Sequence, residues 1–189
     1  MDKAIFLDRD GVINKLIFNS ERNEFEPPFT SEDLKINEGV TDALRLFSDN
    51  NYKLFLVSNQ PDHAKGKTTL EELKKVHESL DKILKTEKIF FTEYYYCYHH
   101  PNGIVNEYTI DCECRKPKPY FVLKAIQDYN IDKENSWLIG DRDTDIQCGI
   151  ASGLKTVLIE NPDSKNYTGN STPDFKAKSL KDAAEIILN

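Results

Sequence analysis

Short apolar segments alternate with segments of helical periodicity along most of this chain, and this alternation restricts the fold more than any other feature. Five apolar runs predict buried strands, at residues 3–7, 52–58, 92–97, 136–140 and 155–160. Helical patterns follow these runs, at residues 39–47, 68–84, 118–129, 145–153 and 179–188. Strands that alternate with helices form β-α units, so we expect an α/β fold with a mostly parallel central sheet between two helical layers.

The length of 189 residues suits a single domain, residues 1–189, with one full hydrophobic core. Two segments interrupt the alternation, residues 11–38 and residues 98–117. Both are longer than ordinary connections in a compact domain, and long loops of this kind are usually functional. We therefore expect residues 11–38 to form a flap over a site.

Charge and apolar content exclude several classes of protein. The net charge of −7 argues against a nucleic-acid partner, which usually requires a basic face. No apolar run approaches the roughly 20 residues of a membrane helix, and the start MDKAIFLD does not resemble a signal peptide. We expect a cytoplasmic protein that binds neither membrane nor nucleic acid, in which the four cysteines stay reduced.

Polar residues follow three of the predicted strands. Asp8 and Asp10 come after the first, Ser58 to Gln60 end the second, and Asp141 follows the fourth. Each pattern alone is also typical of a turn or a helix cap. Ligands of open parallel sheets bind at the carboxyl ends of strands, however, so these side chains should meet there. Several carboxylates without a nearby histidine favour a hard cation such as Mg²⁺.

The segments FLDRDGVIN, LVSNQ, CRKPKP and LIGDRDTDI resemble, in this order, the four motifs of the haloacid dehalogenase (HAD) superfamily of phosphatases. The resemblance extends over about residues 4–160. It implies a Rossmann-like three-layer sandwich, a catalytic Mg²⁺, and phosphoryl transfer through an aspartyl-phosphate. Carboxylates are known nucleophiles in such chemistry, provided that cations neutralise the attacking and attacked groups.

The resemblance also implies roles for individual residues. Asp8 would be the nucleophile, and the Asp10 side chain would be first general acid and then general base. Asp8, Asp141 and the main-chain carbonyl of Asp10 would hold Mg²⁺, and either Asp143 or Asp145 could assist them.

Three further residues would contact the phosphate by the same resemblance. Ser58 and the backbone around Asn59 would bind the phosphoryl oxygens. Lys116 would add positive charge next to the phosphate and the nucleophile. Outside the CRKPKP motif, Lys116 would more commonly be a surface lysine.

The segment CYHHPNGIVNEYTIDCEC holds a possible zinc site. Three thiols and one imidazole, from Cys97, His99, Cys112 and Cys114, make a tetrahedral set without an open position. The one-residue spacing is tighter than usual, so free cysteines with exposed histidines remain an alternative, and His100 is a rival to His99. Cys148 falls on a predicted helix and should pack in the core.

A C-x-H…C-x-C loop that leads into CRKP resembles a branch of the superfamily without a large cap domain. That branch contains heptose 1,7-bisphosphate phosphatases and histidinol-phosphate phosphatases. The resemblance implies that Cys97, His99, Cys112 and Cys114 bind a structural zinc, that residues 97–114 form the zinc loop, and that this loop directs Arg115 and Lys116 towards the site.

The branch implies a small phosphorylated sugar as substrate. Arg115 can hold a second anionic group, which favours a bisphosphate and removal of the C7 phosphate of D-glycero-D-manno-heptose 1,7-bisphosphate in heptose precursor biosynthesis. Lys65 should also bind substrate, although the family more often has arginine there, and the two are not interchangeable. The exact sugar and its anomer stay open, and a monomer is the expected state.

Two other functions compete with this prediction. Histidinol phosphate carries an amine, which carboxylates of the flap such as Glu21, Glu24 and Glu26 could bind, although a solvated charged loop is the simpler interpretation. A noncatalytic, zinc-stabilised binding module is the second alternative. The presence of all the motif residues argues against it, since a protein without activity would not need them.

Overall fold

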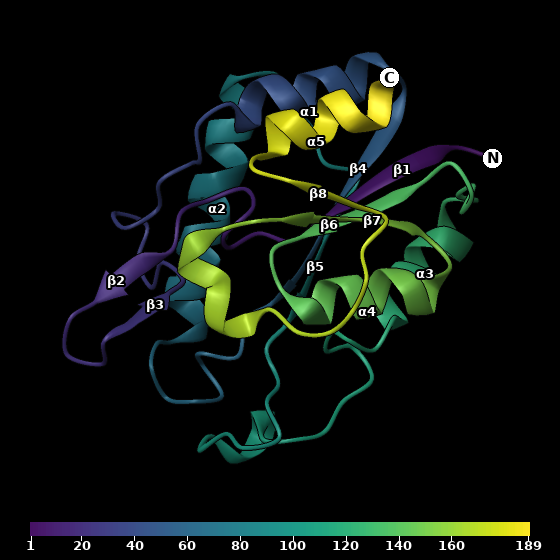
Figure 1. Cartoon of the computed structure of the whole chain (residues 1–189). Coiled ribbons are helices and arrows are strands. Elements are labelled where there is room, and N and C mark those ends of the chain that lie inside the picture. Colours follow the sequence, from purple (N-terminus) through teal and green to yellow (C-terminus); the bar gives the residue numbers. More distant parts are fainter.

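The computed structural model describes residues 1–189 and contains a six-stranded parallel sheet (Figure 1). The strand order is β5-β4-β1-β6-β7-β8, and every neighbouring pair is parallel. The strands are β1 (Lys3–Leu7), β4 (Tyr52–Asn59), β5 (Glu93–Cys97), β6 (Trp137–Gly140), β7 (Lys155–Ile159) and β8 (Phe175–Ala177). The five predicted strands are all present, and β8 is an additional short edge strand.

Helices cover both faces of the sheet (Figure 1). They are α1 (Val40–Asp49), α2 (Leu70–Thr86), α3 (Tyr120–Asp128), α4 (Asp143–Ser152) and α5 (Leu180–Leu188). The larger core cluster packs α1, α2 and α5 against one face, and the smaller cluster packs α3 and α4 against the other. The predicted three-layer α/β fold is therefore confirmed.

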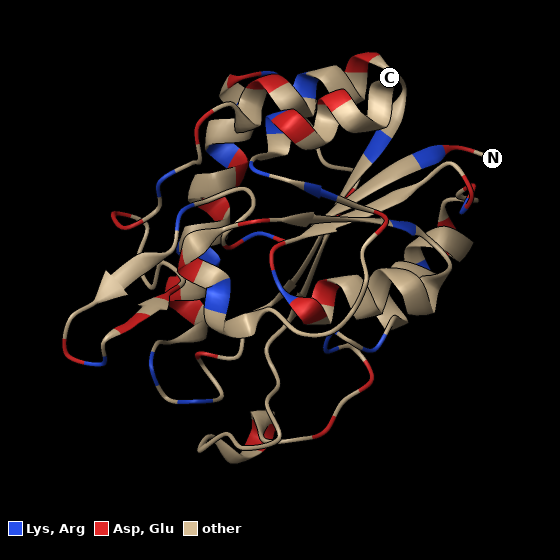
Figure 2. Cartoon of the chain, in the orientation of Figure 1, with Lys and Arg blue, Asp and Glu red and all other residues tan.

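Burial on both faces explains why the central strands lack an alternating pattern. Residues Ala4 to Leu7 of β1 are all completely buried, as expected for the middle of a parallel sheet covered on both sides. Cys148 of α4 lies in the smaller core cluster, which confirms its predicted packing role. Charged residues of both signs are distributed over helices and loops, while each strand of the sheet carries at most one charged residue (Figure 2).

Capping residues mark several of the helix ends. The side chain of Thr69 accepts a hydrogen bond from the backbone N–H of Glu72 at the start of α2, and Ser179 does the same for Asp182 in α5. Gly153 ends α4 in the left-handed conformation, with φ of +75°. These caps lie at or within a few residues of the boundaries expected from the helical patterns.

The two interrupting segments lie near the carboxyl end of the sheet, in place of a large cap domain (Figure 1). Residues 11–38 contain a small antiparallel hairpin, β2 (Ile17–Asn19) and β3 (Glu24–Glu26), which the sequence patterns do not indicate. The second segment carries only a short 3₁₀ turn, Asn106–Tyr108. None of the helices is both long and apolar enough to span a membrane.

Candidate active site

Three aspartates form the floor of the candidate site. Asp8 follows β1, Asp141 follows β6, and Asp145 lies in the first turn of α4. One carboxylate oxygen from each lies within 4.8 Å of the others, and all three residues are buried. The structure therefore brings the predicted pair Asp8 and Asp141 together, and it adds Asp145 to them.

Electrostatics at this cluster favour a bound cation. Burial, together with the charges of Asp8 and Asp145, raises the pKa of Asp141 to about 8. Its Oδ1 atom is buried and has no hydrogen-bond partner, whereas Ser164 donates to Oδ2. Three buried carboxylates with an unpartnered oxygen fit a hard divalent ion such as Mg²⁺, which takes oxygen ligands. The side chain of Asp143, the other candidate, accepts hydrogen bonds from Ser171 and Gln147 instead.

Lys116 neutralises part of this acidic cluster. Its Nζ atom lies 3.0 Å from Asp8 Oδ1 and 2.7 Å from Asp145 Oδ1, and it donates to the carbonyl of Val57 at 2.6 Å. Burial lowers the pKa of Lys116, but Asp145 and Asp8 raise it more, so the pKa lies above its usual value. The lysine is therefore a permanent buried cation beside Asp8.

Two reciprocal hydrogen bonds hold Lys116 in place. The Asn59 side chain accepts from the backbone N–H of Lys116 and donates to its carbonyl, both at 3.0 Å. Asn59 is the last residue of β4, so this contact connects the loop before α3 to the carboxyl end of that strand. The neighbouring Ser58 is buried, and its hydroxyl accepts a hydrogen bond from Gln60 at 3.0 Å.

Asp10 lies apart from the three clustered carboxylates and is surrounded by donors. Arg9 binds both of its oxygens, at 3.1 and 3.2 Å, and Asn14 and Gln60 donate at 3.0 and 2.5 Å. Burial raises the pKa of Asp10, but Arg9 and these hydrogen bonds lower it more, so the pKa lies below its usual value. Asp10 is therefore ionised in the free protein, and its orientation is fixed.

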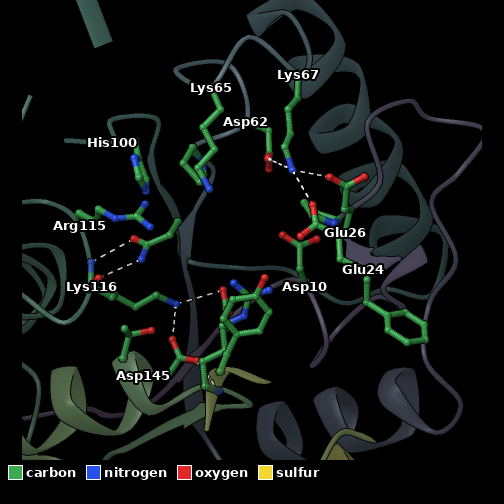
Figure 3. A pocket seen from close by; sticks show the side chains of 18 residues that line it. Asp10, Glu24, Glu26, Asp62, Lys65, Lys67, His100, Arg115, Lys116 and Asp145 are labelled. Carbon is green, nitrogen blue, oxygen red and sulfur yellow. Dashed lines mark hydrogen bonds and ion pairs between the residues drawn. The ribbon is translucent and has the colours of Figure 1, made fainter. Parts of the chain in front are cut away.

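A pocket of about 290 Å³ opens above these residues (Figure 3). Asp8, Asp10, Asn59 and Lys116 line it together with the predicted substrate residues Lys65 and Arg115. Neither of these two cations forms an ion pair with a carboxylate, and burial lowers the pKa of both. Unpaired cations in a pocket indicate an anionic ligand.

Several pocket residues are absent from the sequence-based prediction. Arg142 lines the pocket with a buried Nε atom that has no partner, and its guanidinium lies 4.2 Å from the ring centre of Tyr167. Arg142 could have been predicted as a pocket residue, because it directly follows Asp141. Tyr167 could not, because it lies in a 3₁₀ segment after β7, Pro162–Tyr167, which no sequence pattern places near the site.

The flap contributes the carboxylates of Glu24 and Glu26 to the pocket wall, whereas Glu21 is not among the lining residues. Glu26 forms ion pairs with Lys67 and Arg22, and Lys67 also contacts Glu24 at 3.2 Å. These pairs connect the hairpin to the segment after β4. The flap carboxylates are therefore already occupied by cations of this chain.

Cys97, His99, Cys112 and Cys114 form a second cluster, and their ligand atoms all lie within 4.8 Å. The sulfur atoms are 3.2 to 3.5 Å apart, no disulfide joins them, and His99 Nδ1 lies 3.4 Å from Cys114 Sγ. This donor set suits a four-coordinate zinc ion. His100, the rival ligand, lines the pocket instead.

We expect Gly11→Ala to disrupt the acidic cluster. Gly11 has φ of +88°, and an added Cβ would lie 2.0 Å from Asp141 Oδ2. The backbone strain alone should cost about 1–2 kcal/mol, and the displaced Asp141 should lower activity as well. Gly153→Ala is the matched control, since its φ is +75° but the nearest atom lies 3.8 Å away. Thermal unfolding and phosphate release should separate the two variants, and equal activity in both would contradict this account.

Comparison with known proteins gives a consistent result. Residues 113–183 match the HAD-hydrolase-like family model. The chain is 34% identical over 185 residues to the D-glycero-beta-D-manno-heptose-1,7-bisphosphate 7-phosphatase of Yersinia pestis, which covers 97% of this chain and 94% of that protein. The protein of the same name from Haemophilus influenzae is 34% identical over 188 residues, with 99% and 97% covered.

Solved structures show the same fold. A D,D-heptose 1,7-bisphosphate phosphatase from B. bronchiseptica, complexed with magnesium and phosphate, matches with a TM-score of 0.80 and 22% identity over 98% of both chains. Since two relatives above 30% identity cover nearly the whole chain, the sequence resemblance extends well beyond the four short motifs. The chain therefore belongs to the haloacid dehalogenase superfamily of phosphatases, in the family that contains these heptose-bisphosphate enzymes.

Proposed function

We propose that this phosphatase hydrolyses D-glycero-D-manno-heptose 1,7-bisphosphate at C7, in a Mg²⁺-dependent reaction through an aspartyl-phosphate on Asp8. The observation that carries the proposal is the convergence of Asp8, Asp141 and Lys116 beneath a pocket with unpaired cations. The names of the relatives from Yersinia pestis and Haemophilus influenzae support the choice of substrate.

The acidic cluster is the proposed magnesium site. Asp8, Asp141 and the main-chain carbonyl of Asp10 would hold the ion, which would stabilise negative charge on the phosphoryl oxygens. Asp145 accepts the ion pair from Lys116 and the backbone N–H of Arg142, so we assign it a positioning role.

Asp8 is the proposed nucleophile. A carboxylate oxygen forms a bond to phosphorus while the bond from phosphorus to the sugar oxygen breaks. Lys116, 3.0 Å from Asp8 Oδ1, reduces the repulsion between this carboxylate and the phosphate. Ser58 and the backbone around Asn59 would donate hydrogen bonds to the phosphoryl oxygens. Water then attacks phosphorus, and the bond to Asp8 breaks.

Asp10 is the proposed acid and base. A bound phosphate adds negative charge beside Asp10, which raises its pKa and favours the protonated acid that the leaving sugar oxygen requires. After that oxygen has taken the proton, Arg9 stabilises the resulting carboxylate at 3.1 Å. The same carboxylate then takes a proton from the attacking water.

The second phosphate of the substrate would bind at Arg115 and Lys65. Both cations line the pocket without carboxylate partners, and arginine suits bidentate phosphate recognition. The arrangement favours a bisphosphate over histidinol phosphate, because Lys67 and Arg22 already occupy Glu26, one of the carboxylates that an amine would need. We further propose that the active form is a monomer.

The cluster of Cys97, His99, Cys112 and Cys114 is the proposed structural zinc site. Zinc would hold together the segment that leads directly into Arg115 and Lys116, and so it would fix two pocket cations. The three cysteines of the cluster are not joined by disulfides, so they remain available as zinc ligands. A reducing compartment preserves that form, so we also propose a cytoplasmic location.

Elemental analysis of the purified protein is expected to find about one zinc per chain. EDTA should remove this zinc less readily than it removes Mg²⁺. Cys114→Ser should lower both the zinc content and the thermal stability. Cys148→Ala is the control, since this buried cysteine lies outside the cluster, and it should keep the zinc. A zinc-free wild-type protein with unchanged stability would contradict the assignment.

A phosphate-release screen with Mg²⁺ tests the substrate. It compares both anomers of the heptose bisphosphate with histidinol phosphate and with sugar monophosphates. We expect the highest kcat/KM with a heptose bisphosphate, and Arg115→Ala should lower kcat/KM for the bisphosphate more than for a monophosphate. A preference for a monophosphate or for histidinol phosphate would refute the proposed substrate.

A further inference from the structure

The wall of the pocket has two chemically different sides (Figure 3). Lys65, His100 and Arg115 lie on one side, and Asp62 and Glu24 lie on the other, together with Lys67. The cationic side accounts for an anionic group of the substrate. The acidic side has no counterpart in the reaction described above.

On the acidic side of the pocket, Asp62 is the residue whose carboxylate has no hydrogen-bond partner. It follows β4 in the turn before α2, lines the pocket, and is only 4% exposed. Its carboxylate forms no hydrogen bond, and its closest cation is Lys67 Nζ at 4.0 Å, which is too far for one. Lys67 itself is held by Glu26 and Glu24, so it is not available to move closer.

The carboxylate oxygens of Asp62 are not among the fully enclosed polar atoms without a partner, so they are open to the solvent in the pocket. Burial raises the pKa of Asp62, and Lys67 and Lys65 only partly offset that effect. Polar groups that are largely buried usually form hydrogen bonds with protein groups or with ordered water. No protein group donates to the Asp62 carboxylate, so a ligand that displaces water from this wall of the pocket has to supply hydrogen-bond donors in its place.

The surroundings of Asp62 limit which donors fit. A phosphate would be repelled by the carboxylate, and an ammonium group would be disfavoured by the neighbouring Lys65, which has no carboxylate partner. Neutral hydroxyl groups meet neither objection, and one carboxylate can accept hydrogen bonds from two adjacent hydroxyls. The carbon chain of a sugar phosphate carries such groups.

We propose that Asp62 is a specificity-determining residue that accepts hydrogen bonds from hydroxyl groups of the substrate's carbon chain. The inference rests on the proposed phosphatase function and deepens it. The substrate then lies with its scissile phosphate at Asp8, its second anion at Lys65 and Arg115, and its hydroxyls towards Asp62. The enzyme thereby selects polyhydroxylated phosphates over phosphate esters without hydroxyls.

The test compares three substrates in Asp62→Ala, Asp62→Asn and the wild type. The substrates are the heptose bisphosphate, histidinol phosphate and p-nitrophenyl phosphate, which has no hydroxyl on its carbon skeleton. The ratio of kcat/KM for the sugar to that for p-nitrophenyl phosphate should fall about 10–100-fold in Asp62→Ala, as expected for hydrogen bonds to a charged group. Asp62→Asn, which keeps one acceptor oxygen, should show a smaller fall.

The controls separate a substrate contact from a structural effect. Asp128→Asn removes a charge from an exposed ion pair on α3 and should leave the ratio unchanged. Because the carboxylate of Asp62 has no hydrogen bond to lose and only a long contact with Lys67 at 4.0 Å, both Asp62 variants should unfold close to the wild-type temperature. An equal loss with all three substrates, or a loss confined to histidinol phosphate, would overturn the inference while leaving the phosphatase function intact. A wild-type protein inactive on every substrate would overturn both.

Discussion

Replacing Asp8 by Asn is expected to reduce phosphate release by at least about 10⁴-fold. The other catalytic groups act only together with the nucleophile, so they cannot compensate for its loss. The amide is a far weaker nucleophile than the carboxylate. The amide oxygen can still accept the two interactions that Asp8 Oδ1 makes in the wild type. These are the hydrogen bond from the backbone N–H of Arg9, at 2.7 Å, and the contact from Lys116 Nζ, at 3.0 Å. Steady-state phosphate release with saturating Mg²⁺ measures the loss.

The same substitution should not weaken the fold. In the absence of a cation, burial and the charges of Asp8 and Asp145 raise the pKa of Asp141, and Asp8→Asn removes one of the two sources of that repulsion. We therefore expect a melting temperature in EDTA at or above that of the wild type. Asp143→Asn is the matched control, because Asp143 lies two residues from Asp141 but outside the cluster, and it should keep most of the activity. Turnover by Asp8→Asn within tenfold of the wild type would exclude Asp8 as the nucleophile.

The sequence allowed prediction of the parts of the fold that depend on regular burial. The strand β1 is buried along its whole length between two helical layers, so an uninterrupted apolar run marks it clearly. The hairpin of β2 and β3 leaves no comparable pattern, because each strand has three residues and most of them are only partly buried. Short strands that pack on one side only are hard to distinguish from loops.

The residues of the candidate site also differ in how well they could be predicted from the sequence. Asp8 and Asp141 could be placed together because each directly follows a predictable strand, and parallel strands end at the same edge. Asp145 joins them from the first turn of α4, five residues beyond the strand end that the pattern marks. Asp62 and Tyr167 reach the pocket from a turn and a 3₁₀ segment, whose paths depend on tertiary contacts rather than on periodicity.

Lys116→Met is expected to cause the largest loss of stability. Lys116 is 3% exposed and lies within 3.0 Å of two buried carboxylates, Asp8 and Asp145. Removal of one partner from a buried ion pair leaves uncompensated charge and costs about 3–5 kcal/mol. For a chain of this size, that corresponds to a fall in melting temperature of roughly 6–20 °C. Activity should also fall about 10²–10³-fold, because positive charge beside the phosphate is lost.

The stability effect can be traced to the acidic cluster in two ways. Mg²⁺ should restore part of the lost melting temperature, because a divalent cation neutralises the same carboxylates. In a double-mutant cycle, Asp145→Asn should recover part of the stability of Lys116→Met, because it removes one of the charges left unpaired.

Lys118→Met provides the comparison that decides whether burial is the cause. Lys118 also contacts two carboxylates, Asp111 at 2.9 Å and Glu113 at 3.2 Å, but both carboxylates are exposed. Exposed ion pairs contribute about 0–1 kcal/mol, so this variant should unfold close to the wild-type temperature. If Lys116→Met and Lys118→Met had the same melting temperature, Lys116 would not be the cation that stabilises the buried carboxylates. Its proposed role beside the nucleophile would then lose its physical basis.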